Sequence, residues 1–451
     1  MKAYQDASLA PARRAKALLE EMTLAEKVGQ LNQRLYGFRI YERKCVNGED
    51  TIELSEEFRQ EVEKYSGLGV LYGLYRADPW ADKDYETGLT GVLSKKAYNQ
   101  VQRYVLEHSR LGIPVMMSSE CPHGHQALDG YLLPVNLLAG ATFDPAMVRA
   151  AYRVSGRQLQ NMGVDFALMS MLDVLRDPRW GRSEECYSED PYLSARMAEA
   201  AVIGMQESGP KVVAKHFAAQ GEGTGGVNAS AARIGERELR EIHFPPAAAA
   251  IKAGAKGIMA AYNEIDGVYC HANRWLLNDV IRKEMGFDGI VMSDGVAIDQ
   301  LDSMTGDNVV SGALALQSGV DVGLWDEAFG KLEEAVRRGL VKEAQIDQAV
   351  LRVLTLKFER GLFEHPYLEE EGEIHMDYAQ NPESVQLARE GLVILQNKNQ
   401  VLPFWENQAS GKKIAVVGPN ADDLYNQLGD YTPPLRRDDG ITVLDGMKLI
   451  F

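Results

Sequence analysis

Paired cysteines are missing from this sequence. Its four cysteines, Cys45, Cys121, Cys186 and Cys270, are scattered, and no two of them have the CxxC spacing of a structural zinc site. We therefore expect reduced thiols, no bound metal or other cofactor, and a cytoplasmic location. Long apolar runs are missing as well: residues 1–6 lack the apolar core of a signal peptide, and no run is long enough to span a bilayer. A membrane partner is therefore not expected.

Positive charge is also in short supply. The 451 residues include 48 Lys and Arg against 65 Asp and Glu, which gives a formal net charge of −17 at pH 7. Nucleic-acid binding needs positive patches against the phosphate backbone, so we expect no nucleic-acid partner. An acidic balance fits a neutral or cationic ligand and leaves the oligomeric state open.

What the chain does contain is an alternation of strand-like and helix-like segments. Close to eight βα repeats follow one another over roughly 300 residues, which predicts an α/β fold with a (β/α)8 TIM-like barrel rather than an open sheet. A helix is expected over about Ala10–Leu31, with Thr23 as an internal cap, whereas the polar segment Leu35–Leu54 predicts no element. The expected strands are Leu68–Tyr72, Ile113–Met117, Ala141–Phe143, Val164–Met169, Val212–Ala214, Ile258–Tyr262, Gly289–Ser293 and Val320–Leu324.

The C-terminal part of the sequence has a different character. We expect the barrel to occupy residues 1–363 and a charged, proline-bearing linker with one helix, near Val385–Leu395, to occupy residues 364–410. Residues 411–451 then begin a second α/β domain with a strand at Ile414–Val417. About forty residues are too few for such a domain to bury a core, so we expect it to be truncated. The glycine turn after this strand lacks the GxGxxG spacing, which argues against a dinucleotide site.

One carboxylate stands at the centre of the predicted chemistry. Asp294 follows the apolar run Gly289–Ser293, so it lies at the C-terminal end of a barrel strand, where the loops of such barrels converge. Gly295 directly after it allows a sharp turn and leaves the carboxylate uncovered. The alternative is that Asp294 is an N-cap that starts the next helix.

Polar side chains follow four other strand-like runs. They include Glu120, Arg182, the pair Lys215 and His216, and Tyr262, so acids, bases, an imidazole and an aromatic ring meet at one predicted mouth. Each also has a purely structural interpretation. Arg182 could pair with a neighbouring loop glutamate, His216 could be a satisfied core histidine, and Tyr262 could be packing.

These motifs, in this order, resemble the family 3 glycoside hydrolases, the group of β-glucosidases and β-xylosidases. The resemblance runs from about residue 10 to the end of the chain. The segments that carry it are Met22–Gln30, Asp177–Arg182 with Glu189–Pro191, Lys215–Phe217, Glu236–Ile242, Gly286–Asp294 and Ile414–Asp422.

The resemblance implies a role for each candidate residue. Asp294 is expected to be the nucleophile, which forms a glycosyl-enzyme that water hydrolyses with net retention. Lys215, His216 and Arg182 match positions that hold the hydroxyls of the terminal sugar, Glu120 matches an acid that binds the distal hydroxyls of the same sugar, and Tyr262 matches an aromatic residue close to the nucleophile. The substrate implied is an oligosaccharide or an aryl or alkyl β-glycoside.

Three departures from the family pattern bear on this expectation. Glu120 stands where many β-glucosidases have aspartate and β-xylosidases have glutamate, and its longer side chain would fill the space of a hexose hydroxymethyl group. Gly295 replaces a tryptophan that often walls the aglycone side. The general acid/base glutamate is usually supplied from beyond the barrel, and the loop around Glu222 does not match the histidine loop that replaces it in one subgroup.

No general acid is therefore assigned, and two other functions remain open. The chain could be a catalytically impaired fragment or a sugar-binding remnant, which a longer parent reading frame would decide. Another barrel enzyme, such as an aldolase, would need a Schiff-base lysine or a phosphate loop, for which Lys215 alone is poor evidence.

Overall fold

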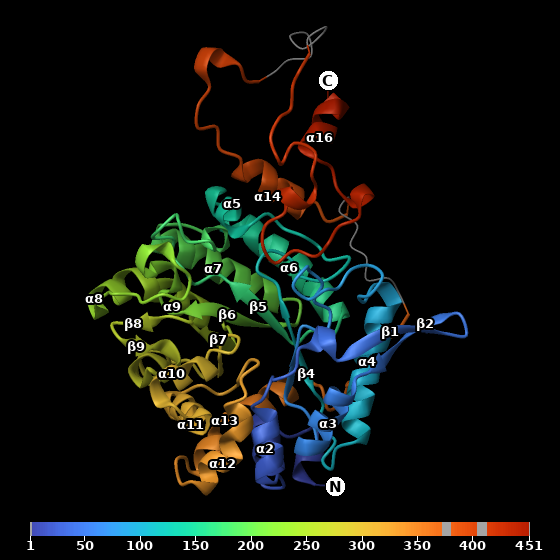
Figure 1. Cartoon of the computed structure of the whole chain (residues 1–451), viewed down its shortest axis with the longest axis vertical. Coiled ribbons are helices and arrows are strands. Elements are labelled where there is room, and N and C mark those ends of the chain that lie inside the picture. Colours follow the sequence, from blue (N-terminus) through green and yellow to red (C-terminus); the bar gives the residue numbers. More distant parts are fainter. Residues whose placement is uncertain (1, 372–379, 404–412, 451) are drawn as a thin grey trace.

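The computed structural model describes residues 2–371, 380–403 and 413–450. Its centre is a parallel sheet with the strand order β10-β7-β6-β5-β4-β3 (Figure 1). Each strand pairs in parallel with its neighbour in the order, as expected of successive βα units. The strands are β3 (Val70–Tyr72), β4 (Met116–Glu120), β5 (Phe166–Ser170), β6 (Lys211–Phe217), β7 (Gly257–Ala260) and β10 (Ile290–Met292).

Two further segments complete the ring of strands. Residues 320–325 form backbone hydrogen bonds with Ser293 at the β10 edge (2.8 Å) and with residues 31–36 on their other side (2.9 and 3.0 Å). Residues 31–36 in turn accept a bond from Val70 at the start of β3 (3.4 Å). The predicted (β/α)8 barrel is therefore present, although its first strand position, residues 31–36, falls between the predicted helix and the segment Leu35–Leu54 and is not among the predicted strands.

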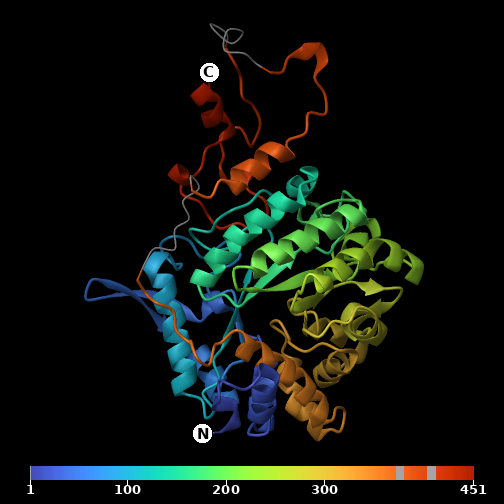
Figure 2. The same ribbon diagram turned by 180° about the vertical axis from the view of Figure 1, so that it is seen from behind.

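Helices surround this barrel on the outside, and α6 and α7 lie side by side in both views (Figures 1 and 2). Apart from Lys211, every residue of the six central strands is buried, as expected of parallel strands covered on both faces. Among the described residues, no helix combines the length and the apolar character needed to cross a bilayer. The helices before residue 370 are α1 (Pro11–Leu19), α2 (Leu24–Gln30), α3 (Glu56–Tyr65), α4 (Gly91–Glu107), α5 (Asn136–Ala141), α6 (Pro145–Asn161), α7 (Pro191–Gln206), α8 (Glu236–Glu238), α9 (Phe244–Lys252), η8 (Trp275–Glu284), α10 (Asp302–Thr305), α11 (Asn308–Ser318), α12 (Leu332–Arg337) and α13 (Glu343–Glu359).

Three local predictions need correction. The helix expected over Ala10–Leu31 is two helices, α1 and α2, because Thr23 caps the second one: its hydroxyl accepts the backbone N–H of Glu26. The strand expected at Ala141–Phe143 is wrong, since Ala141 ends helix α5. The segment left without an element contains an antiparallel hairpin of β1 (Tyr41–Val46) and β2 (Glu49–Leu54). A smaller hairpin, β8 (Glu264–Ile265) with β9 (Val268–Tyr269), follows β7.

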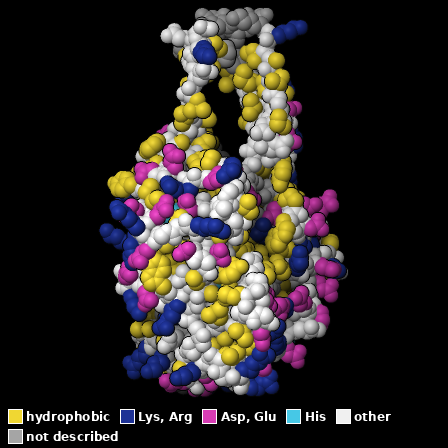
Figure 3. All heavy atoms as spheres, turned by 60° about the vertical axis from the view of Figure 1, so that its left-hand side comes forward, with side chains coloured by type: hydrophobic (Ala, Val, Ile, Leu, Met, Phe, Trp, Pro, Cys, Tyr) yellow, Lys and Arg dark blue, Asp and Glu magenta, His cyan; other side chains and the backbone are white. Residues whose placement is uncertain are grey.

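The part of the chain after the barrel forms α14 (Glu383–Gly391), which packs against α5 and α6, and α16 (Val443–Ile450). The helix predicted in the linker is therefore present. The strand predicted at Ile414–Val417 is not formed, because no described strand lies beside it to share its backbone hydrogen bonds. Exposed apolar side chains lie along the part of the chain that follows α14 and extends away from the barrel (Figure 3). Among them, Leu395 is 93% exposed. The division into barrel, linker and second domain stays a prediction.

Candidate active site

Asp294 lies two residues after β10, at the end of the barrel where the other polar loops meet. Its Oδ1 accepts the N–H of Gly295 at 2.8 Å. Its Oδ2 is buried and has no hydrogen-bond partner among the described residues. The N-cap alternative is wrong, because a capping aspartate accepts an N–H from two or three residues further along, and Asp294 accepts only that of its neighbour. A buried oxygen without a partner at the mouth of a barrel is placed to meet a ligand.

The backbone of Asp294 is held by a neutral histidine. Its N–H donates to Nε2 of His271 at 3.1 Å. Burial lowers the pKa of His271 to about 4, so this imidazole is uncharged at neutral pH and can accept the bond. The backbone of the loop after β10 is thereby held at Asp294.

His216 stands beside the nucleophile candidate at the end of β6. Its Nδ1 lies 2.8 Å from Oδ2 of Asp173, and its Nε2 lies 3.7 Å from Oδ2 of Asp294. Nε2 also lies 3.1 Å from Nη2 of Arg182, which can only donate. This network assigns the proton to Nδ1, where Asp173 accepts it. The core-histidine alternative is thus only partly correct. His216 is buried and its Nδ1 is hydrogen-bonded to Asp173, but its Nε2 faces Asp294.

Arg182 forms the loop ion pair of the structural alternative and more. Its Nε and Nη2 donate to the carboxylate of Glu185 at 2.5 and 2.9 Å. Burial opposes the ionisation of Glu185, but the charge and hydrogen bonds of Arg182 outweigh it and lower the pKa of this carboxyl to about 2. The same Nη2 also lies within hydrogen-bond distance of Nε2 of His216. Arg182 is therefore anchored on one side and presents charge to the site on the other.

Lys215 and Glu120 form a buried ion pair across the site. Nζ of Lys215 lies 2.6 Å from Oε2 of Glu120, and the two residues are 2% and 6% exposed. The other carboxylate oxygen accepts the hydroxyl of Tyr72 at 3.1 Å. A buried charge pair is stable only when its remaining groups are satisfied, and Tyr72 supplies part of that satisfaction. The pair leaves a cation and an acid side by side on the rim of the site.

The wall next to Gly295 is made by another residue. A Cβ placed on Gly295 would lie 2.6 Å from Trp325, whose ring stacks on Tyr36 with 4.5 Å between centroids. Trp325 follows the last strand-like segment, and its indole Nε1 is buried without a hydrogen-bond partner among the described residues. Tyr262 closes the same side by donating its hydroxyl to Gly295 O at 2.9 Å. Trp325 therefore occupies the space beside Gly295 into which a side chain at position 295 would extend.

Known proteins resemble this chain over most of its length. Residues 23–356 match the model of the glycosyl hydrolase family 3 N-terminal domain. The chain belongs to glycosyl hydrolase family 3. A putative β-xylosidase of Formosa agariphila is 33% identical over 441 residues, covering 94% of this chain and 55% of that protein. The periplasmic β-glucosidase of Salmonella typhimurium is 31% identical, covering 96% of this chain and 53% of that protein.

Solved structures of β-glucosidases share the fold of this chain. A β-glucosidase from Erythrobacter marinus superposes with a TM-score of 0.87 at 32% identity, covering 99% of this chain and 58% of that one. The β-glucosidase from Listeria innocua in complex with glucose gives a TM-score of 0.83 at 30% identity, covering 97% and 58%. The chain spans about half the length of the curated relatives it matches.

In this family 3 chain, one site residue comes from beyond the barrel. The hydroxyl of Tyr431 accepts from Nη2 of Arg182 at 3.1 Å, and Nζ of Lys215 lies 3.5 Å from that oxygen and 4.6 Å from the ring centroid. The neighbouring carbonyl of Asp430 lies 2.5 Å from Nε2 of His123. Burial raises the pKa of Tyr431 well above its ordinary value, so the hydroxyl stays protonated. The segment around residue 431 therefore folds over the cations of the site.

Glu222 is engaged elsewhere. Its carboxylate pairs with Nε of Arg176 at 3.1 Å and with Nε2 of His243 at 3.4 Å. The nearby His243 and Arg176 outweigh burial and lower the pKa of Glu222. A general acid needs a raised pKa, so Glu222 is a poor candidate for that role.

The structure brings Asp294, Arg182, Lys215, His216 and Glu120 together at one end of the barrel, and Tyr262 beside them. Their roles in catalysis and sugar binding stay predictions. Sequence reasoning missed four contributors: Asp173, His271, Trp325 and Tyr431. Asp173 and Trp325 carried a usable signal, because each follows a strand-like run, whereas nothing near Tyr431 or His271 pointed to the site.

Proposed function

We propose that this chain carries the nucleophile and the terminal sugar subsite of a retaining, exo-acting β-glycosidase. Its substrates would be oligosaccharides or aryl and alkyl β-glycosides that end in β-linked xylose or glucose. The observation that carries the proposal is the free, buried Oδ2 of Asp294 beside the imidazole of His216 and next to the Arg182 and Lys215 cations. The names of the relatives, β-xylosidase and β-glucosidase, support the same class of substrate.

The proposed reaction has two displacements. In the first, Oδ2 of Asp294 bonds to the anomeric carbon while the bond from that carbon to the leaving oxygen breaks; this oxygen keeps the electron pair and, with no general acid assigned, takes its proton from water. In the second, a water oxygen bonds to the same carbon, the ester bond to Asp294 breaks, and the water loses a proton. Because each step inverts the anomeric carbon, the product keeps the configuration of the substrate.

The surrounding groups would orient the sugar for this attack. Gly295 N–H holds Oδ1, which leaves Oδ2 to the reacting carbon. Arg182, Lys215 and His216 carry nitrogen atoms that reach the same space and would bond to the sugar hydroxyls. Arg182 and Lys215 would donate, whereas Nε2 of His216 would accept from a hydroxyl, and such fixed groups cost little reorganisation during the reaction.

We further propose that the terminal subsite prefers a pentose, with a β-glucoside as the alternative substrate. Glu120 reaches Lys215 with its full side-chain length, and Tyr431 lies against the same lysine. Both side chains occupy space next to the cations that a hexose hydroxymethyl group would need. One extra carbon in a tight subsite changes specificity by only about 1–3 kcal/mol, so a modest preference is expected.

One observation favours a second function, that of a sugar-binding protein with impaired catalysis. With Glu222 held in ion pairs, we assign no general acid, and the chain would then be a catalytically impaired fragment or a sugar-binding remnant. A missing general acid costs typically about 10²–10⁴-fold, and least for a leaving group that needs no proton. The two functions therefore differ in the substrates that the purified chain can cleave.

Turnover of two substrates by the purified chain tests both functions. A dinitrophenyl β-xyloside needs little acid assistance, and β-1,4-xylobiose needs much. The proposed hydrolase cleaves the first, and cleavage of the second as well would show that a general acid is present. Asp294→Asn should lower kcat on the dinitrophenyl substrate by at least about 10³-fold, whereas Asp288→Asn, an exposed aspartate before the same strand, should not. Xylose binding without cleavage of either substrate would favour the sugar-binding remnant and contradict the hydrolase.

A further inference from the structure

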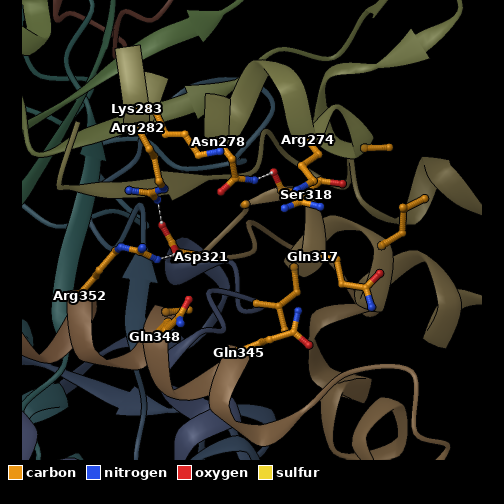
Figure 4. A pocket seen from close by; sticks show the side chains of 15 residues that line it. Arg274, Asn278, Arg282, Lys283, Gln317, Ser318, Asp321, Gln345, Gln348 and Arg352 are labelled. Carbon is orange, nitrogen blue, oxygen red and sulfur yellow. Dashed lines mark hydrogen bonds and ion pairs between the residues drawn. The ribbon is translucent and has the colours of Figure 1, made fainter. Parts of the chain in front are cut away.

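A cavity of about 570 Å³ lies away from the catalytic mouth, between η8, α11 and α13 (Figure 4). Arg282, one of its lining residues, donates to Gly289 O at the start of β10. Gly289 precedes Asp294 by five residues, which is about 16 Å along an extended strand. The cavity is thus at the opposite end of the barrel from the candidate active site, and its volume is in the range of small-molecule sites.

The charges that line this cavity are unbalanced. Arg282 and Arg352 donate to the two oxygens of a single carboxylate, Asp321, at 2.6 and 2.7 Å, and Figure 4 shows them on either side of it. Arg274 and Lys283 add two more cations, and Asp321 is the only acid among the described lining residues. A protein with a net charge of −17 therefore concentrates positive charge in one hollow.

Part of this network has a structural role, but not all of it. Asp321 also accepts the N–H of Val291, so the carboxylate and its two arginines hold the end of the barrel together. Lys283 is partly neutralised by Asp279, one helical turn away at 2.5 Å. The Arg274 side chain, which belongs to an exposed residue at the start of η8, has no hydrogen bond or ion pair within the described parts of the chain. The guanidinium of Arg274 is therefore available to a ligand. So is the positive charge that Asp321 leaves uncompensated on Arg282 and Arg352.

We propose that this cavity binds a small oxyanion, either inorganic phosphate or sulfate or the phosphate or sulfate group of a small polar ester. Guanidinium groups match the geometry of such oxyanions, which they bind through paired N–H donors. The carboxamides of Asn278 and Gln348 at the same cavity supply donors and acceptors for hydroxyl groups on an ester. Arg274 and Arg352 would bind the oxyanion, with Lys283 at the rim.

The lining argues against other classes of ligand. None of the fifteen described lining residues is aromatic, so there is no ring on which a neutral sugar or a nucleobase could stack. The single lining carboxylate is already shared by two arginines, which leaves nothing to bind a cation. A ligand that brings negative charge is the one that this set of side chains complements.

Isothermal titration calorimetry of the whole chain in phosphate-free buffer of low ionic strength tests the proposal. The probes are inorganic phosphate, glycerol 3-phosphate and, as the neutral control, glycerol. Saturable binding of one phosphate or one glycerol 3-phosphate is expected, and none of glycerol. Tighter binding of glycerol 3-phosphate would identify an ester as the ligand class, and equal binding would identify the free oxyanion. Absence of saturable binding for both anions would overturn the proposal.

Variants place the binding in this cavity. Arg274→Gln and Arg352→Gln should each weaken phosphate binding by at least about tenfold, because each removes charged hydrogen bonds. Arg237→Gln, an exposed arginine of α8 whose side chain is 89% accessible, removes the same charge elsewhere and should not change binding. Arg352→Gln also removes a bond to Asp321 that holds the end of the barrel together. Arg274→Gln breaks no ion pair, so its effect on phosphate binding is the decisive one. Phosphate that bound at the catalytic mouth instead would be unaffected by Arg274→Gln and would contradict the proposal.

Discussion

The hydroxyl of Tyr431 lies 3.1 Å from Nη2 of Arg182, although 249 residues separate them in the chain. The same arginine holds Glu185 and meets His216, so one guanidinium joins the barrel loop, the imidazole beside Asp294 and the segment after the barrel. A group with so many partners is held in one orientation. The predictions below test that network, its neighbours and the chemistry proposed for it.

Removal of the Tyr431 hydroxyl should loosen its segment. Tyr431→Phe removes the hydrogen bond between the Arg182 guanidinium and this segment, while Glu185 and His216 still satisfy Nη2. The expected cost is therefore that of one buried hydrogen bond to a charged group, about 1.5–3 kcal/mol. Backbone amides near residues 428–433 should exchange hydrogen faster in this variant, as measured by hydrogen–deuterium exchange with mass spectrometry, while β5 and β6 keep their protection. Tyr425→Phe is the matched control, since Tyr425 is exposed in the same segment. Unchanged exchange in Tyr431→Phe would show that the Arg182 contact does not hold the segment in solution.

A shorter acid at position 120 should shift the choice of sugar. Glu120→Asp withdraws the carboxylate from Lys215 and opens space for a hydroxymethyl group. The ratio of kcat/KM on aryl β-xyloside to that on aryl β-glucoside should fall by about tenfold, which corresponds to about 1.4 kcal/mol. If the wild type already prefers the glucoside, or if the ratio rises in the variant, the steric argument is wrong.

The close contact between Gly295 and Trp325 should make position 295 intolerant of a side chain. Gly295→Ala places a Cβ 2.6 Å from the Trp325 ring, and such overpacking costs about 1–3 kcal/mol. Urea unfolding should show this loss, and Trp325→Leu in the same chain should recover part of it. Gly235→Ala, where no atom lies within 4 Å of the added carbon, is the control. Equal stability of Gly295→Ala and the wild type would mean that Trp325 is free to move.

The ion pair between Arg182 and Glu185 predicts a pH dependence of stability. The pKa of Glu185, about 2, lies below the ordinary value of 4.5, so the folded protein favours the ionised form of this carboxyl. The resulting stability is present above about pH 4.5 and is lost as the pH falls toward 2. The difference in unfolding free energy between the wild type and Glu185→Gln should therefore shrink between pH 5 and pH 3.

Urea unfolding at a series of pH values measures this difference. Glu241→Gln is the control, because Glu241 is an exposed glutamate in a surface pair. Its effect on stability should be small and nearly the same at every pH. A difference between the wild type and Glu185→Gln that does not change with pH would contradict the assignment of the low pKa.

The sequence predicted most of what lies on the barrel, and the reason is local. Asp294, Lys215 and His216 directly follow apolar runs, and the C-terminal ends of parallel strands meet at one mouth. The first strand position, residues 31–36, escaped prediction because polar residues 32–34 interrupt it and Leu31 continues the helical spacing of the preceding residues. It joins the ring through backbone hydrogen bonds, which leave no periodic pattern in the side chains.

The rest of the site depends on contacts between segments that are distant in the sequence. Tyr431 reaches Arg182 only because the segment after the barrel folds back, and no spacing rule encodes that return. Trp325 fills the place opposite Gly295 because two neighbouring strands present them side by side. The position of Trp325, directly after the strand-like segment Val320–Leu324, is the one sequence feature that indicates a place at the mouth of the barrel.

The most direct test of the account is to find where a slow substrate becomes attached. A dinitrophenyl 2-deoxy-2-fluoro-β-xyloside reacts with the nucleophile of a retaining glycosidase and forms a glycosyl ester that hydrolyses slowly. After incubation with the purified chain, proteolysis and mass spectrometry would locate the sugar. The account predicts one label per chain on the peptide that contains Asp294, and no label in Asp294→Asn. A label on another carboxylate, such as Glu120 or Glu222, would contradict it.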